Sequence, residues 1–363
     1  MFIKISKGLA LLIAQNYSTG ISEITNSLNS LFDAMYEKKH VVMVDRDSIA
    51  LLMNCESITI KSKYVMKWIE RHYNDLYAIT KMLSISIILI EPGRAYLDGN
   101  VYYLPVDEYY NFCETQLLTE NDDDFLFYLK IYPFIYSAQT IYSVCFENNP
   151  FYGGNVASRI QCMYNEKKFF LCIVDSDKEY STARKGSTYK SAKSEILHHK
   201  DMILPWGLYV LNVREKENLF PLNLFIEGCK EQSELIRIIL DNATEETFRF
   251  IKIKDGIKLK HIKETDAHWM EVYGKILADC KRKNVYIDTT DNEEYCIKGI
   301  NSKALKVVSD PFFEKNNYKT LQQSSMIDKI FAKQIFIIEE WKEIAHKLFD
   351  YGCCLSKQVN FLT

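Results

Sequence analysis

Apolar residues follow two different spacings along the first third of the chain. Over residues 1–40 they recur every three or four positions, a spacing that predicts helix. The runs His40–Asp45 and Ser84–Gly93 are instead short, continuous and rich in Val or Ile, which predicts buried strands. A helix is expected between them, near Lys61–Leu83. This alternation predicts an N-terminal α/β region over residues 1–113.

The middle of the chain repeats the alternation and predicts a second α/β domain over residues 114–225. An acidic helix starts near Asp122, and Gly153-Gly154 opens another helix near Asn155–Asn165. Four apolar runs predict the strands of this domain: Cys113–Glu120, Thr140–Glu147, Lys168–Asp177 and Trp206–Val213. Open parallel sheets place their sites at the carboxyl ends of such strands.

Helical spacing dominates residues 226–363. One exception is residues 251–263, where two alternating runs flank Asp255-Gly256, a strong signal for a two-residue β-hairpin. A last helix near Ala332–Tyr351 is expected to end at Gly352. The C-terminal region is therefore predicted to be mainly helical, with one hairpin.

Two carboxylates follow the first predicted strand of the middle domain. Glu120 ends that strand, and Asp124 comes four residues later in the first turn of the next helix. This spacing lets both side chains face a shared metal ion. Acidic residues are also favoured as caps of helix N-termini, so a capping cluster is the structural alternative.

Asp175 and Asp177 end an almost wholly apolar strand. Two like charges at this place repel, and removing them from water is costly unless a cation compensates. Hard divalent cations such as Mg²⁺ and Mn²⁺ prefer carboxylate oxygens. The pair therefore predicts a divalent-metal site, whereas a surface turn is the alternative interpretation of an Asp-x-Asp sequence.

A third acidic group follows the last strand of the middle domain. Glu215 and Glu217 are followed by Asn218, directly after an apolar run. The carboxylates are candidate metal ligands, and a solvated charged turn is the alternative.

The charge balance restricts how the chain can meet nucleic acid. Its 363 residues hold 45 Lys and Arg against 48 Asp and Glu, a net charge of −3, which excludes a wholly basic coat protein. Residues 178–200 hold six Lys or Arg against two Glu, a local +4, and are expected to form a flexible phosphate-contacting loop. A solvated charged loop is the alternative. The candidate contacts are Lys178, Arg184, Lys185 and Lys190.

Three further features concern location and cofactors. Ten scattered cysteines without a CxxC pair are typical of reduced thiols in a cytoplasmic protein. No apolar run reaches the roughly 18 residues that a membrane helix needs. The sequence has no GxxxxGK[ST] motif, so an ATPase is not expected in this chain.

The order of the acidic signals resembles the TOPRIM catalytic domain. In that family an apolar strand ends in Glu, an Asp follows four residues later, and a later strand ends in Asp-x-Asp. Glu120, Asp124, Asp175 and Asp177 match these positions, while Asn121 stands where the family usually has Gly.

The segment after the last strand extends the resemblance to about residues 115–225. Arg214–Phe220, with the sequence REKENLF, is similar to a segment of TOPRIM nucleases in bacterial defence. These include the nuclease half of OLD proteins and the subunit that is paired with an ATPase in PARIS-type systems.

The resemblance implies a Rossmann-like, mostly parallel sheet in residues 114–225. It also implies a metal-dependent endonuclease that hydrolyses phosphodiester bonds of DNA or RNA, tRNA included, as the effector of an anti-phage defence system. An ATPase or sensor protein would then act in trans, with no membrane involved.

Two Mg²⁺ or Mn²⁺ ions held by carboxylates can neutralise the phosphate and activate water for this reaction. Asp175 and Asp177 are expected to hold one ion, with Glu120 nearby as a ligand or as general acid or base. The expected catalytic residues are therefore Glu120, Asp175 and Asp177. The expected metal ligands are Glu120, Asp124, Asp175, Asp177, Glu215 and Glu217.

Two other functions stay open at this point. One is a different TOPRIM phosphotransferase, for example a primase-like enzyme. The other is a non-catalytic α/β sensor or interaction protein of a defence complex, whose acids bind a regulatory cation or nothing. Residues 1–113 are expected to form a homodimer interface or to dock a partner in either case.

Overall fold

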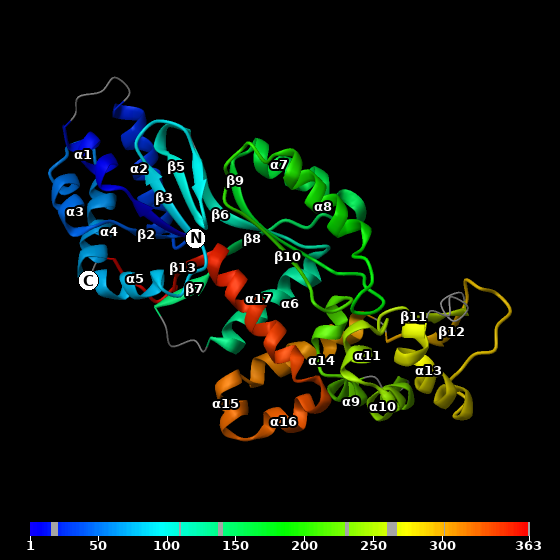
Figure 1. The fold of residues 1–363 in the computed structure, drawn as a ribbon. Helices are drawn as coiled ribbons and strands as arrows, with labels where there is room; N and C mark the ends of the chain where they lie inside the picture. Colours follow the sequence, from blue (N-terminus) through cyan, green and yellow to red (C-terminus); the bar gives the residue numbers. More distant parts are fainter. Residues whose placement is uncertain are drawn as a thin grey trace.

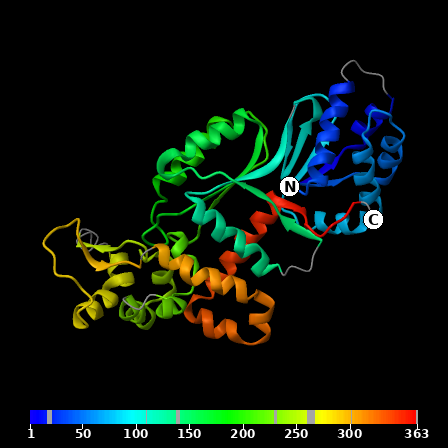
Figure 2. The same ribbon diagram turned by 180° about the vertical axis from the view of Figure 1, so that it is seen from behind.

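The computed structural model describes residues 1–15, 21–108, 110–136, 141–228, 232–259, 267–300 and 302–361. Its two larger sheets are mostly parallel, which confirms the α/β class expected for the first two thirds of the chain. Figures 1 and 2 show the N-terminal unit at one end, the second sheet in the middle and the helical region at the other end. None of the helices in the described ranges combines the length and apolar content needed to cross a membrane.

The first sheet belongs to the N-terminal unit and has the order β2-β1-β3-β5-β4. All neighbours in it are parallel except the edge strand β4. Its strands are β1 (Phe2–Ile5), β2 (Val41–Met43), β3 (Ser86–Ile90), β4 (Tyr96–Asp98) and β5 (Val101–Pro105). Five helices accompany it: α1 (Lys7–Gln15), α2 (Ile21–Tyr36), α3 (Arg46–Met53), α4 (Ile60–Arg71) and α5 (Tyr73–Thr80).

The expectation of helix throughout residues 1–40 is wrong at its beginning. Phe2, Ile3 and Ile5 lie in strand β1, which pairs with β2 on one side and with β3 on the other. A four-residue strand in the centre of a sheet is too short to be separated from the helical spacing that follows it. Helices α1 and α2 confirm the rest of the expectation.

The second sheet is fully parallel and has the order β10-β9-β6-β8. Helices α7 and α8 cover one face, and α6 and α17 cover the other (Figure 1). The strands are β6 (Asn111–Leu118), β8 (Phe146–Asn148), β9 (Lys168–Val174) and β10 (Trp206–Val210). The helices are α6 (Asp122–Ile135), α7 (Val156–Asn165), α8 (Ser187–His198) and α17 (Phe336–Gly352).

Strand β6 has β8 on one side and β9 on the other, so the order of the sheet reverses between β6 and β9. In open α/β sheets such a switch point leaves a crevice outside the carboxyl ends of the two strands, where ligands bind. Glu120 follows β6 and Asp175 follows β9 directly. The topology therefore brings these two expected site residues to the same edge.

Helix α17 confirms the last predicted helix, including its end at Gly352, and returns the chain to the second sheet. Glu340 is buried and accepts hydrogen bonds from the hydroxyl of Tyr209 (2.9 Å) and the backbone N–H of Asn212 (2.8 Å). Trp341 donates to the carbonyl of Leu219 (2.9 Å). These contacts fix the segment after β10, which carries Glu215 and Glu217.

The chain end also joins the two sheet-bearing units. Strand β13 (Cys353–Leu355) follows α17 and pairs antiparallel with β7 (Tyr142–Val144). The backbone nitrogen of Met1 donates to the carbonyl of Cys353 (2.8 Å). Figure 1 shows the two termini on the same side of the molecule.

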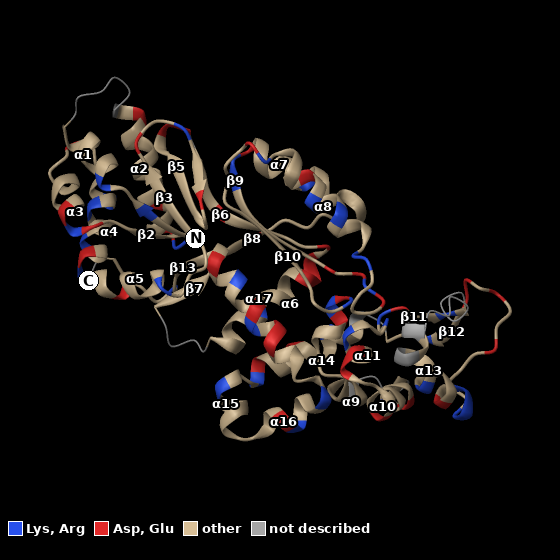
Figure 3. Cartoon of the chain, in the orientation of Figure 1, with Lys and Arg blue, Asp and Glu red and all other residues tan. Residues whose placement is uncertain are grey.

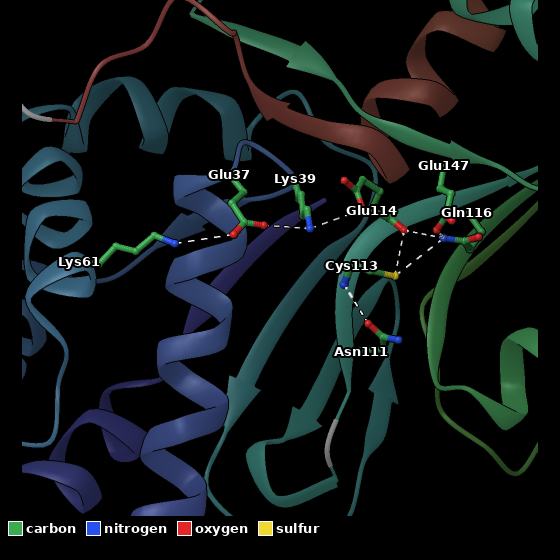
Figure 4. A network of polar contacts seen from close by, with 8 residues as sticks. All are labelled: Glu37, Lys39, Lys61, Asn111, Cys113, Glu114, Gln116 and Glu147. Atoms are coloured by element: carbon green, nitrogen blue, oxygen red, sulfur yellow. Dashed lines mark hydrogen bonds and ion pairs between the residues drawn. The ribbon is translucent and has the colours of Figure 1, made fainter.

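A polar network connects the N-terminal unit to the start of β6 (Figure 4). Lys39 forms ion pairs with Glu37 (2.9 Å) and with Glu114 of β6 (3.7 Å). Gln116 of β6 donates from its side-chain amide to Glu147 of β8 (2.5 Å). The network therefore places strand β6 relative to the N-terminal unit and to β8.

The remaining elements form a mainly helical region between β10 and α17. Its helices are α9 (Phe225–Gly228), α10 (Ser233–Asn242), α11 (Glu245–Phe250), α13 (Ala267–Arg282), α14 (Ser302–Lys315), α15 (Tyr318–Gln323) and α16 (Met326–Phe331). The aromatic rings of Phe220, Phe312 and Trp341 pack together, with centroids 5.4 to 6.3 Å apart. This cluster attaches the helical region to α17.

The predicted hairpin over residues 251–263 is wrong. Strand β11 (Gly256–Lys258) pairs antiparallel with the distant β12 (Tyr295–Lys298). Gly256 has φ +89°, and a Cβ there would lie 2.1 Å from the carbonyl oxygen of Ile297. Glycine is thus required by a close approach of two backbones. Residues 260–263 of the predicted hairpin lie outside the described residues.

Candidate metal and catalytic site

Five of the six expected metal ligands meet beyond the carboxyl ends of β6, β9 and β10. Burial raises the pKa of Asp175 well above its usual value, and the negative charges of Asp124, Glu217, Glu215 and Glu120 raise it further. Residues separated by almost 100 positions in the sequence are therefore electrostatic neighbours. Figure 3 shows acidic positions where α6 begins and where the chain leaves the second sheet toward α11. We call these five residues the carboxylate cluster.

Glu120 lies on the exposed side of the carboxylate cluster. Partial burial raises its pKa, as do Asp124 and Asp177, while Lys254 and Lys216 oppose the rise. Its backbone carbonyl accepts the N–H of Tyr152 (3.0 Å), in the turn that leads into Gly153. The Gly-Gly turn therefore supports the loop that carries Glu120.

Asp124 is buried and is not the cap of its helix. The cap is Asn121, whose side chain accepts the backbone N–H of Asp124 (3.0 Å). The side chain of Asp124 accepts a hydrogen bond from the ammonium of Lys216 instead. The capping alternative thus applies to Asn121, at the position where the TOPRIM pattern has Gly, and leaves Asp124 in the carboxylate cluster.

Lys216 and Lys254 supply positive charge to the carboxylate cluster, and sequence reasoning missed both. Burial alone would lower the pKa of Lys216, but Asp124 and Glu217 outweigh it and raise the pKa. Lys254 behaves in the same way, with Glu217 and Glu120 as its strongest acidic neighbours. Lys216 stands between two candidate ligands in the sequence, whereas Lys254 belongs to a strip of lysines in the segment predicted as a hairpin.

Glu215 and Glu217 are both buried, which excludes a solvated turn. An Oε1 oxygen of Glu215 accepts the backbone N–H of Lys254 (2.9 Å), and its own N–H donates to Asn218 (3.2 Å). Burial, followed by the charge of Glu217, raises the pKa of Glu215 to about 7. Glu215 therefore uses its carboxylate to tie the segment before β11 to the site.

Glu217 differs from Glu215 in one decisive respect. Its side chain is only 3% exposed, and its Oε1 oxygen is buried without a hydrogen-bond partner. Burial raises its pKa, against the opposing charges of Lys216 and Lys254. An unsatisfied buried carboxylate oxygen is costly and is rare in folded proteins. It is the group of the site that most needs a cation.

Asp177 lies at the outer edge of the carboxylate cluster. It is exposed and has φ +54°, and its N–H donates to the carbonyl of Arg214 (3.0 Å). The intervening Ser176 is buried and donates to the carbonyl of Val213 (2.5 Å). A Cβ at Gly186 would lie 2.0 Å from the carboxylate of Asp177. The Asp-x-Asp segment is thus held from both sides, and Ser176 was a missed structural residue.

The type of ligand atoms at this site suits a metal ion, but their placement does not yet form a ligand cage. Six carboxylates against two lysines leave an excess of negative charge, and oxygen donors of this kind suit Mg²⁺ or Mn²⁺. Among the described residues, however, no group of three or more His, Cys, Asp or Glu is placed to hold an ion. The ammonium of Lys216 already occupies one side of Asp124. The donor set fits a hard cation, but these side chains do not form a complete ligand cage.

The four candidate nucleic-acid contacts follow Asp177 in the chain. Lys178 donates to the carbonyl of Ser181 (2.5 Å), Arg184 and Lys190 are exposed, and the ammonium of Lys185 lies 4.5 Å from the ring centre of Tyr189. The expectation of one flexible loop over residues 178–200 is wrong from Ser187 onward, where α8 begins. The basic positions thus extend from a short loop onto the first turn of a helix.

Comparison of the chain with protein-family models, curated proteins and solved structures gives no match. The TOPRIM resemblance therefore stays a prediction from the order of acidic residues and strands. The cysteines of the described residues are free thiols.

Proposed function

We propose that this protein is a metal-dependent nuclease that hydrolyses phosphodiester bonds of DNA or RNA with Mg²⁺ or Mn²⁺. One observation supports the proposal above all others. Asp175 and four further carboxylates meet at the switch point of a parallel sheet, and one buried oxygen of Glu217 has no hydrogen-bond partner. Like charges in such a place are expected to be compensated by a cation.

Asp175, Asp124 and Glu217 are the residues that would hold the metal, with Asp177, Glu120 and Glu215 around them. When bound, a divalent ion neutralises phosphate charge and lowers the pKa of a coordinated water. Displacement of the Lys216 ammonium from Asp124 would complete the ligand set.

Two residues at the rim of the carboxylate cluster have roles of their own. Glu120 is exposed on one side, and partial burial with the charge of Asp124 raises its pKa, so it is placed to hold or move a proton. Lys254 carries a positive charge beside the same carboxylates, so it can bind a phosphate oxygen. Lys178, Arg184 and Lys190 continue this positive charge away from Asp177.

The Lys216–Asp124 contact favours one alternative function. A cluster balanced by its own lysines needs no metal, as in a non-catalytic sensor or interaction protein. The unsatisfied oxygen of Glu217 argues against a complete balance. The sequence resemblance supports three further proposals: a role in anti-phage defence, an ATPase partner in trans and, as the alternative enzyme, a primase-like phosphotransferase. The cysteine composition supports a cytoplasmic location.

The test is cleavage of labelled DNA and RNA by the purified chain with EDTA, Mg²⁺ or Mn²⁺. We expect cleavage with metal that is lost in Asp175→Asn. Asp98→Asn is the matched control, because Asp98 is exposed on the edge strand of the other sheet. Equal cleavage by Asp175→Asn would contradict the proposed function, and absence of cleavage with every substrate would favour the sensor.

A further inference from the structure

A cavity lies at the far end of α6 from the carboxylate cluster. Its volume is about 410 Å³, and it opens where α5, the end of α6, β7 and α17 meet (Figure 1). This volume lies within the range of small-molecule sites in proteins. The N-terminal unit contributes Asp75, Ala78, Ile79 and Met82, and α6, α17 and β7 contribute the other sides, so the cavity lies where the two units meet.

Four aromatic rings line this cavity, together with Ala78, Ile79, Met82, Ile141 and Asp75. Tyr132 stacks on Phe349 with ring centres 5.9 Å apart and planes within 14°, and Tyr136 is tilted against Phe349 at 6.2 Å. Tyr142 of β7 adds a fourth ring, and Met82 stands half-exposed beside the opening. Such a lining favours a ligand with apolar surface.

The charge of the wall is negative. Asp75, in the first turn of α5, is the single charged side chain among the described residues that line the cavity. Its carboxylate and the aromatic rings act on one another: burial raises the pKa of Tyr142, and Asp75 is among the charges that raise it further. An anion would be repelled from this cavity.

Aromatic faces together with a carboxylate attract one class of ligand. A cation over an aromatic ring gains electrostatic attraction that a neutral molecule of the same shape does not, and quaternary ammonium groups are recognised by such aromatic cages. A small metal ion would find too few oxygen donors here. We propose that the cavity binds an organic cation, an alkyl- or arylammonium compound whose positive nitrogen lies near Asp75 and whose apolar part lies against Tyr132, Tyr136 and Phe349.

The test is calorimetric titration of the full chain with benzyltrimethylammonium and, separately, with neopentylbenzene, its neutral isostere. We expect one site for the cation and at least about tenfold weaker binding of the neutral compound. Asp75→Asn should weaken the cation about five- to tenfold and leave the neutral compound unchanged, whereas Asp98→Asn should change neither.

A second variant tests the aromatic wall. Tyr136→Leu keeps apolar volume at a half-buried position and removes one ring, so it should weaken the cation more than the neutral compound. Equal affinity for the two compounds, no binding of the cation at millimolar concentration, or unchanged affinity in Asp75→Asn would each overturn the proposal. None of these outcomes depends on whether the protein cleaves nucleic acid.

Discussion

The ammonium of Lys216 donates a buried hydrogen bond to the carboxylate of Asp124, across 92 positions of sequence. Their side chains are 10% and 8% exposed. The contact joins the first turn of α6 to the segment after β10, so it couples two elements that each carry an expected metal ligand. It also places a positive charge where the proposed function requires a divalent cation.

Replacing Lys216 by Met should therefore have a cost that depends on metal. Without metal, Asp124 would be left as an unpaired buried charge, and the free energy of unfolding should fall by about 3–5 kcal/mol. A bound cation would compensate the same charge, so Mn²⁺ should recover most of the loss in a chemical-unfolding experiment. The double variant Lys216→Met with Asp124→Asn should be more stable than the single one without metal. A loss that Mn²⁺ leaves unchanged would contradict a shared role of lysine and metal.

Glu217→Gln and Glu215→Ala should have different effects, because Glu215 accepts the N–H of Lys254, whereas the Oε1 oxygen of Glu217 has no hydrogen-bond partner. Glu215→Ala leaves the N–H of Lys254 without its acceptor and should cost about 1–3 kcal/mol of stability. Glu217→Gln removes a charge from a repulsive cluster, so it should keep the fold while Mn²⁺ affinity falls at least about tenfold. Calorimetric titration and urea unfolding of both variants check this. Equal losses of Mn²⁺ affinity and of stability in the two variants would contradict different roles for Glu215 and Glu217.

Stability of the metal-free protein should fall as pH rises from about 4.5 to about 7. Burial raises the pKa of Glu215 from its ordinary 4.5 to about 7 in the folded protein, so between these values the folded state binds more protons than the unfolded state. This pKa change of Glu215 alters the free energy of unfolding by an amount on the order of 3 kcal/mol. The pKa values of Asp175, Glu120 and Glu217 are also raised. Chemical unfolding of wild type in EDTA at several pH values measures the slope of the free energy of unfolding against pH. This slope should be shallower for Glu217→Gln in EDTA and for wild type in Mg²⁺. An equal slope in all three would be evidence against a strained carboxylate cluster.

Nucleic-acid binding should depend on the positive positions beside Asp177. Arg184→Glu with Lys190→Glu should weaken binding of every sequence alike and reduce the salt dependence by about one unit per lost phosphate contact. Binding is measured in an Asp175→Asn background to prevent cleavage, at several salt concentrations. Lys67→Glu is the control, since Lys67 is exposed on α4 of the N-terminal unit. An effect of the control as large as that of the pair would disprove a local contact.

The carboxylates of the site could be predicted from the sequence because their placement depends on local order. Glu120, Asp175 and Glu215 each follow an apolar strand, and parallel strands bring their carboxyl ends to one edge whatever lies between them. The difference between Glu215 and Glu217 could not be predicted in this way, because it depends on which oxygen meets the N–H of Lys254.

The two lysines of the site show more clearly what could not be predicted from the sequence. The sequence predicts a hairpin around Lys254, since Asp255-Gly256 has the local signature of one, but the β11–β12 pairing joins positions about 40 residues apart. Non-local pairing of this kind leaves no periodic signal in the sequence. Strand β1 was missed for a related reason, because a central four-residue strand is stabilised by its two neighbours and not by its own length.

The central claim is that the carboxylate cluster is a divalent-cation site, and calorimetric titration of the metal-free chain with Mn²⁺ tests it most directly. We predict at least one Mn²⁺ per chain for wild type and for Asp98→Asn, and at least about tenfold weaker binding in Asp175→Asn, whose fold should be retained. Wild type that binds no Mn²⁺, or Asp175→Asn that binds it as tightly as wild type, would contradict the claim.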